Sequence, residues 1–353
     1  MASSRHPAQS PDRHSEQRHS WGDRLPAGPW RKRALRYGSV TLAAAVCLLV
    51  VPTAMRSVDS PDRHTATRSP LNCSSSSSLL ANGPGMTTPL GVNATGASQL
   101  AAATAQFGHL PVIRVYYAGV PDPSEWTTGA TGINKSSVVL SFNPTPAQVL
   151  SGADDAGLAA FFDSAPKGHA IYYSFYPEPE AHVKDDEFTL AQYKQAWSRV
   201  VSIADAAHNP YLHSTLILQG QDGFPGDEYN FKDYLPNGRI ISVIGWDTYP
   251  DGTVEDQDPR PISPAQFMGP DIAAATNACL PFGFAEFALG TATDRPQWLA
   301  QVASYVQKNG ALFGILFDAA GFPWMELHDS ASIQTWRTAV TRSANAASLH
   351  RLQ

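Results

Sequence analysis

The sequence predicts an α/β protein with one (β/α)8 TIM barrel over residues 86–345, in a single domain. Three observations predict this fold. Short β-rich runs alternate with helical patterns, as expected for parallel strands joined by helices. Eight such runs fit into about 260 residues, close to the roughly 250 residues of a typical closed barrel. The segment also lacks a GxGxxG or Walker-type turn, which would favour a doubly wound open sheet.

The eight strands are short apolar runs that recur along the chain. We expect them at residues 90–92, 112–116, 138–142, 170–175, 215–218, 240–246, 282–286 and 312–317. Helices are expected at residues 97–107, near 153–164, and at 189–207, 264–277, 296–309 and 330–346. Thr189 is a suitable N-cap, and Pro296 suits a first helical turn. Asn309-Gly310 is a normal helix stop.

Three segments precede the predicted barrel. Residues 1–37 are basic and rich in Ser, Pro and His, so they are expected to form a disordered cytoplasmic tail. Residues 38–55 carry no charge and follow an Arg/Lys cluster, which indicates a signal anchor or a cleaved signal peptide. Residues 56–85 read as a Ser-rich linker. The barrel is therefore expected outside the cytoplasm, either anchored to the membrane by one N-terminal helix or secreted.

Charge and cysteine content restrict the partners. The net charge is −6 at pH 7 and the basic residues crowd before residue 40, so the barrel is acidic. A nucleic-acid partner would need a basic face and is not expected. The sequence contains no CxxC motif and no Cys/His cluster, so a metal site is not expected. Cys47 lies in the apolar run, which leaves Cys73 and Cys279 as one possible disulfide. Both could instead stay unpaired. The barrel is expected to be a monomer.

Two glutamates stand out at the ends of predicted strands, where barrel enzymes carry their reactive groups. Glu286 closes an apolar seventh strand, and a buried carboxylate is rare without a partner or a task. Glu178 follows the fourth strand between Pro177 and Pro179, which restrict its backbone. A structural salt bridge for Glu286 and an exposed loop acid for Glu178 are the simpler interpretations. Glu180 is the alternative to Glu178 and is expected to be solvated.

Two carboxyl groups are the chemical requirement for hydrolysis of a glycosidic bond. One protonates the leaving oxygen, and the other attacks the sugar carbon. Strands four and seven lie across a barrel mouth from each other, so long side chains from both can converge. This chemistry needs no metal or organic cofactor. A serine hydrolase is disfavoured, because the sequence contains no GxSxG elbow.

The remaining candidates lie near strand ends or in loops, where aromatic rings could stack on sugars and carboxylates could bind hydroxyls. We expect Trp324 to be the main stacking surface and Trp246 to be partly core. Asp247 and Asp318 could instead cap loops, and Arg114 could pair with a barrel carboxylate. The predicted substrate-binding set is Tyr117, Trp126, Trp246, Asp247, Tyr249, Asp318 and Trp324.

Over residues 86–340 the chain resembles glycoside hydrolase family 26, in the form found in actinobacteria. The matching segments are YYSFYPEPE with FTLAQYKQAW, VIGWDTYP, FGFAEFALG with RPQWLAQVASYV, and ILFD, in the family's order. The resemblance implies a retaining, endo-β-mannanase-like glycosidase that cleaves mannan or a related β-linked polysaccharide. It also implies that Glu178 is the acid/base, that Glu286 is the nucleophile and that Tyr249 orients Glu286.

The chain departs from the family at one position. Family members usually carry a histidine directly before the acid/base glutamate, and this chain has Pro177. The missing histidine removes a hydrogen-bonding group beside the acid. A second interpretation therefore stays open, a catalytically impaired barrel that binds cell-surface or environmental polysaccharide.

Overall fold

The computed structural model describes residues 87–94, 96–126, 133, 135–220, 230–238, 240–250, 262–290, 293–319 and 325–350. The predicted segments 1–37, 38–55 and 56–85 and the candidate Trp324 lie outside these residues. Within the part of the chain that is described, no helix has the length and apolar character needed to cross a bilayer. The signal or anchor segment therefore stays a prediction.

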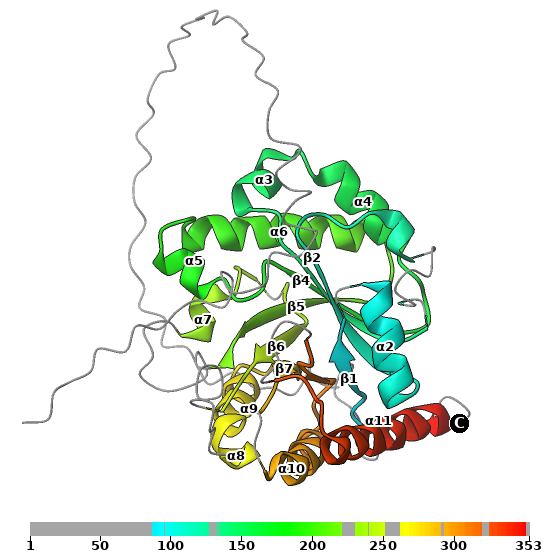
Figure 1. The fold of residues 1–353 in the computed structure, drawn as a ribbon. Helices are drawn as coiled ribbons and strands as arrows, with labels where there is room; N and C mark the ends of the chain where they lie inside the picture. Colours follow the sequence, from blue (N-terminus) through cyan, green and yellow to red (C-terminus); the bar gives the residue numbers. More distant parts are fainter. Residues whose placement is uncertain are drawn as a thin grey trace, which may run out of the picture.

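Eight parallel strands close into one barrel in chain order, as the sequence predicts (Figure 1). The first strand pairs with both the second and the eighth, which completes the ring. The strands are β1 (Leu90–Asn93), β2 (Val112–Tyr117), β3 (Ser137–Phe142), β4 (Ile171–Phe175), β5 (Leu212–Gln219), β6 (Val243–Asp247), β7 (Phe282–Phe287) and β8 (Gly314–Leu316).

Helices surround this barrel. Those described are α2 (Ala97–Phe107), the 3-10 helix η3 (Pro123–Trp126), α3 (Pro146–Ser151), α4 (Asp155–Asp163), α5 (Glu180–Lys184), α6 (Leu190–Ala206), α7 (Phe231–Tyr234), α8 (Pro264–Phe267), α9 (Gly269–Asn277), α10 (Arg295–Lys308) and α11 (Ser330–His350). Thr189 caps α6 as predicted, in a reciprocal capping box with Gln192. The helix predicted over residues 264–277 is instead two helices, because Pro270 lacks the amide hydrogen that a continuous helix needs.

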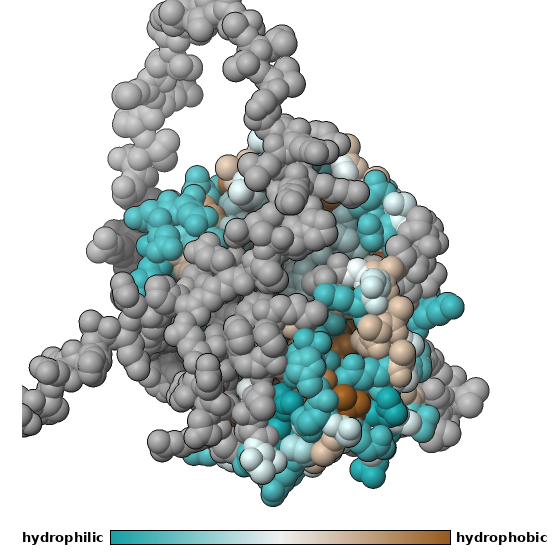
Figure 2. All heavy atoms as spheres, viewed as in Figure 1, coloured by the Kyte–Doolittle hydropathy of each residue, from teal (hydrophilic) through white to brown (hydrophobic). Residues whose placement is uncertain are grey.

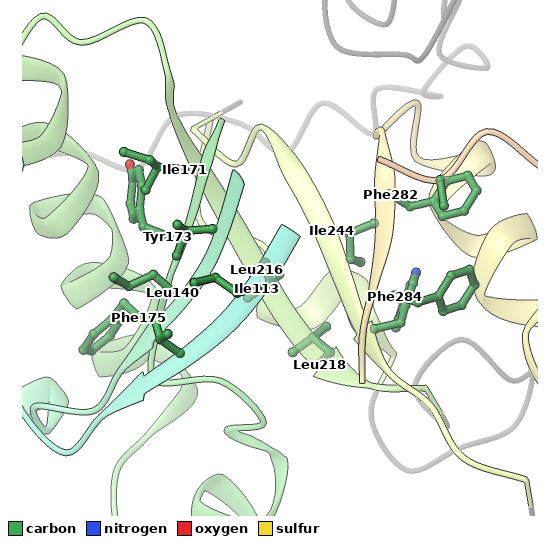
Figure 3. Packing of buried hydrophobic residues seen from close by; sticks show 14 of the residues in the cluster. Ile113, Leu140, Ile171, Tyr173, Phe175, Leu216, Leu218, Ile244, Phe282 and Phe284 are labelled. Atoms are coloured by element: carbon green, nitrogen blue, oxygen red, sulfur yellow. The ribbon is translucent and has the colours of Figure 1, made fainter. Parts of the chain in front are cut away.

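The strand side chains alternate between the helices and the barrel interior. Tyr173 and Phe175 of β4 point toward the helix beside them, and Phe282 and Phe284 of β7 point toward helices on the other side (Figure 3). The opposite faces fill the interior with a second apolar cluster that includes Val112, Val139, Tyr172, Ile217, Val243 and Phe313. On the face shown in Figure 2, hydrophilic side chains gather over α5 and the beginning of α6.

The interior becomes polar toward the C-terminal ends of the strands. On β2, Val112 is followed on the same face by Arg114 and Tyr116, and on β6 Val243 is followed by Asp247. Ser141 of β3 and Ser174 of β4 are also buried at this level. The barrel therefore places its buried polar side chains at the end where barrel enzymes bind their ligands.

The last helix holds the first strand. The Leu90 amide donates a hydrogen bond of 3.1 Å to Ser343 Oγ of α11. Thr88 Oγ1 donates to the Ala311 carbonyl at 2.7 Å, just before β8. These bonds connect the start of the barrel to its last strand and helix.

Cys279 lies after α9 and forms a disulfide. An unpaired Cys279 is thereby excluded. Its partner is one of the two other cysteines, Cys47 and Cys73, and both lie outside the described residues. Pairing with Cys73 stays a prediction.

Gly91→Ala should destabilise the barrel, because a Cβ at residue 91 would lie 1.8 Å from the Val112 carbonyl oxygen. The strands would have to separate, and overpacking of this kind costs about 1–3 kcal/mol. Gly119→Ala is the matched control, since no atom lies within 4 Å of its Cβ position. Urea unfolding of both variants measures the difference, and equal free energies of unfolding would contradict the close contact.

Candidate active site

Glu286 lies near the end of β7, where three donors hold its carboxylate. The Tyr116 hydroxyl donates to Oε1 at 2.6 Å, and the Tyr249 hydroxyl donates to Oε2 at 2.5 Å. Arg114 Nη1 lies 2.9 Å from Oε1. A shift in the β6–β7 register places Glu286 beside Asp247. Both carboxylate oxygens of Glu286 therefore act as hydrogen-bond acceptors.

Arg114 is the buried cation of the site, with 1% of its side chain exposed. Its Nη1 lies 2.5 Å from Asp247 Oδ1 as well as next to Glu286, and its guanidinium lies 4.7 Å from the ring centroid of Tyr116. The predicted pairing of Arg114 with a barrel carboxylate is confirmed. Asp247 is buried in this ion pair, so it does not act as a loop cap.

Glu178 approaches the same place from β4. One carboxylate oxygen from each of Glu178, Asp247 and Glu286 lies within 4.8 Å of the other two. The glutamates that end strands four and seven therefore converge, although 108 positions separate them in the sequence. Three carboxylates at this distance need a compensating positive charge, and Arg114 supplies it by contacting two of them.

Glu178 and Asp247 differ in how strongly they hold a proton. Burial is the main reason that the pKa of Glu178 lies well above its usual range, and the charges of Asp247, Glu286 and Glu180 add to this while Arg114 opposes it. Burial also raises the pKa of Asp247 to about 7, against the pull of Arg114. Because Arg114 touches Asp247 directly, a proton is favoured on Glu178 over Asp247.

The turn that carries Glu178 has an unusual backbone. Tyr176 and Glu178 have φ angles of 48° and 50°, in the left-handed region that side chains larger than glycine rarely adopt. Neighbouring strands hold the turn, since the Tyr176 amide donates to the Phe142 carbonyl and the Glu178 amide donates to the Ile217 carbonyl. Such strain costs about 1–3 kcal/mol per residue and clusters at functional sites.

Tyr116, which sequence reasoning did not choose, replaces the predicted Tyr117 at this site. Successive residues of a strand face opposite sides, so only one of the two tyrosines can reach the interior. Tyr117 packs toward the helices, and its hydroxyl donates to Glu125 Oε2 at 3.3 Å. The spacing from Arg114 to Tyr116 was the available signal, because residues i and i+2 share a face.

Two predicted sugar-stacking residues are core residues, and their predicted role is therefore wrong. Trp126 is 2% exposed, and its ring stacks on Phe161 with centroids 4.7 Å apart. Trp246 is 0% exposed, on the outward face of β6. Neither ring has a face free for a ligand. Trp324, the expected main stacking surface, lies outside the described residues.

The structure fits one of the two interpretations of Asp318 and contradicts the one given for Glu180. Asp318 Oδ1 accepts the Leu327 amide hydrogen at 2.8 Å, which fits the loop-capping interpretation. Its partial burial raises its pKa to about 6. Glu180 was expected to be solvated, but it is only 7% exposed and accepts the Gln219 amide hydrogen at 2.8 Å. The turn after Glu178 folds it inward.

Comparison with known proteins supports the fold. No protein-family model and no curated protein matches the sequence. An endo-1,4-β-mannanase from Rhizomucor miehei aligns in structure with a TM-score of 0.50 at 13% identity, over 73% of this chain and 95% of that one. A family 26 β-mannanase from Bacteroides ovatus has a TM-score of 0.49 at 13% identity, over 73% and 89% of the two chains. A glucosidase from Croceicoccus marinus has a TM-score of 0.49 at 12% identity, over 75% and 68%.

The likeness to the Rhizomucor enzyme shows a shared barrel fold.

Arg114→Met should lower the free energy of unfolding by about 3–5 kcal/mol, because it leaves buried carboxylates without their cation. Arg199→Met is the matched control. Arg199 pairs with Asp155 on the surface, with about 40% of each side chain exposed, and should contribute less than about 1 kcal/mol. Urea unfolding at pH 7 compares the two, and a similar loss in both would show that Arg114 does not stabilise the cluster.

Proposed function

We propose that the chain is a retaining, endo-β-mannanase-like glycoside hydrolase that cleaves mannan or a related β-linked polysaccharide. The observation that carries this proposal is the convergence of Glu178 and Glu286, whose carboxylate oxygens lie within 4.8 Å of each other. Hydrogen-bond donors and Arg114 surround Glu286, whereas burial favours a proton on Glu178. Retaining glycosidases place their two carboxyl groups about 5–5.5 Å apart, whereas inverting enzymes leave about 6.5–9.5 Å for a water molecule. The close approach favours retention.

In the first step Glu286 attacks the anomeric carbon while Glu178 gives its proton to the glycosidic oxygen. The bond between that carbon and oxygen breaks, and a glycosyl ester forms on Glu286. Tyr116, Tyr249 and Arg114 hold the Glu286 carboxylate against rotation, so one of its oxygens is kept in position for the attack.

In the second step the roles reverse. Ester formation removes the negative charge of Glu286, and this charge is one of the causes that raise the pKa of Glu178. Glu178, which has given up its proton, is then a carboxylate that can accept a proton from water. That water gives its proton to Glu178 and attacks the anomeric carbon, the bond between this carbon and the Glu286 oxygen breaks, and Glu286 leaves as a carboxylate beside Arg114.

Family and location belong to the same proposal. The matching segments around Glu178, Asp247 and Glu286 support membership of glycoside hydrolase family 26. A polysaccharide substrate lies outside the cell, which fits residues 38–55 as a signal anchor or signal peptide and an extracytoplasmic monomer. No nucleic-acid partner and no cofactor enter the mechanism.

The second candidate function is a polysaccharide-binding barrel with impaired catalysis. Pro177 favours it, because proline stands where the family usually has a histidine and cannot donate a hydrogen bond beside Glu178. Release of reducing ends from β-mannan, β-glucan and xylan separates the two functions. Binding without release, unchanged in Glu286→Gln, would support this second candidate.

If the hydrolase proposal is right, Glu286→Gln should remove nearly all turnover while the protein still folds. Glu178→Gln should slow substrates with poor leaving groups most, because those need protonation. Glu187→Gln, an exposed acid after α5, is the control and should behave like the parent protein. Steady-state kinetics with aryl and polysaccharide substrates measures all three. Undiminished turnover in both Glu178→Gln and Glu286→Gln would end the proposal.

Tyr116→Phe should lower kcat roughly 10- to 100-fold, because a hydrogen bond to a charged group contributes about 1.5–3 kcal/mol. Tyr117→Phe, one position along, should change kcat less than about twofold, since its hydroxyl faces Glu125 rather than Glu286. The same kinetic assay compares the neighbours. A larger loss of kcat in Tyr117→Phe than in Tyr116→Phe would contradict the assignment of Tyr116, and not Tyr117, to the interior face of β2.

A further inference from the structure

We propose that Glu180 is a positioning residue for Glu178. Glu180 ties the Glu178 turn to β5, and its buried negative charge favours the protonated form of Glu178 before the proton passes to the leaving group. The inference rests on the proposed function, because it assigns Glu178 the role of proton donor. It concerns the second acid of the EPE segment, which no part of the proposed mechanism uses.

The first support is the way the turn is attached to β5. The backbone pairing of β4 with β5 ends at Tyr173 and Ser214. Beyond it, the Glu178 amide donates to the Ile217 carbonyl at 3.0 Å, and Glu180 Oε1 accepts the Gln219 amide hydrogen at 2.8 Å. Glu180 thus continues the attachment with its side chain, after the backbone has left the sheet.

The second support is the strain of this turn. Tyr176 and Glu178 hold left-handed φ angles on either side of Pro177, a conformation that the chain would leave if nothing fixed it. On the other side of the turn, the Tyr193 hydroxyl of α6 donates to the Tyr176 carbonyl at 3.2 Å. Glu180 and Tyr193 therefore hold the two ends of the turn against different neighbours.

The third support is the charge that surrounds Glu178. Arg114 of β2, Asp247 of β6, Glu286 of β7 and Glu180 of α5 all act on its carboxyl group, and Tyr249 after β6 also faces it. Tyr193 of α6 faces Glu180. Arg114 contacts Asp247 and Glu286, and Glu180 accepts a hydrogen bond from the Gln219 backbone amide. The charge of Glu180 is one of the causes that raise the pKa of Glu178.

Burial makes this charge effective. Glu180 is 7% exposed, so water screens it little. Glu187 belongs to the same connection between β4 and α6 but is exposed. Its charge is screened by solvent, which makes it the natural control.

Three variants separate the two parts of the proposal. Glu180→Gln keeps a side-chain oxygen for the Gln219 amide and removes the charge. Glu180→Ala removes both. Glu187→Gln removes a charge of the same sign from the exposed part of this connection. The parent and all three are compared through kcat, KM and the pH dependence of kcat/KM.

In Glu180→Gln the alkaline limb of kcat/KM should move to lower pH by on the order of one unit, because a nearby buried like charge has been removed. Its KM should stay near the parent value. Glu180→Ala should show the same shift and a further loss of kcat of about tenfold, because the turn is released. Glu187→Gln should match the parent. A Glu180→Gln profile that superimposes on the parent profile overturns the proposal, and so does a kcat in Glu180→Ala equal to that of Glu180→Gln.

A measurement without substrate keeps this inference separate from the proposed function. The carboxyl carbon of Glu178 can be followed against pH by NMR in protein labelled with 13C-glutamate, with the signal assigned by its loss in Glu178→Gln. In Glu180→Gln this signal should titrate at lower pH than in the parent. If it does and no substrate is cleaved, the proposed function fails and the electrostatic inference stands. If substrates are cleaved and the titration is unchanged, the function stands and the inference fails.

Discussion

The buried guanidinium of Arg114 is the interaction on which the rest of the site depends. An acidic side chain inside a barrel loses its hydration, and this loss must be offset by a nearby cation, by hydrogen-bond donors or by a bound proton. Arg114 provides that contact for Asp247 and Glu286 through one nitrogen, at 2.5 and 2.9 Å. Glu178 lies near the same cation without such a contact. Arg114 thus pairs with Asp247 and Glu286 and leaves Glu178 as the acid that favours a proton.

The second constraint is the turn from β4 into α5. Holding Tyr176 and Glu178 in a left-handed conformation costs free energy that the packing of β3, β5 and α6 must offset. What the protein gains is a carboxyl group whose direction is fixed before any ligand arrives. The arrangement explains how a glutamate on a loop can face acids that are anchored in strands. It also gives Pro177 a structural role, because its ring limits the backbone between the two strained residues.

The sequence was sufficient for the barrel and for the two glutamates, because both follow from strong regularities. Alternating strands and helices predict a barrel, and strand ends predict where its acids meet. Other features depend on the phase of a strand or the path of a turn. Tyr117 was chosen although Tyr116 points inward, and Trp246 was chosen although its side of β6 is covered by helices. The burial of Glu180 follows from positive φ angles that no local sequence pattern indicated.

The bond between Leu90 and Ser343 joins positions 253 residues apart. β1 likewise completes its ladder only with β8. On a ribosome the first strand therefore emerges long before its second neighbour and its covering helix exist, so the ring can close only after nearly all of this domain has been made. Contacts of such long sequence separation slow folding. Until they form, the nascent chain carries two open sheet edges, and its production in cells will depend on how well these edges are shielded from other chains.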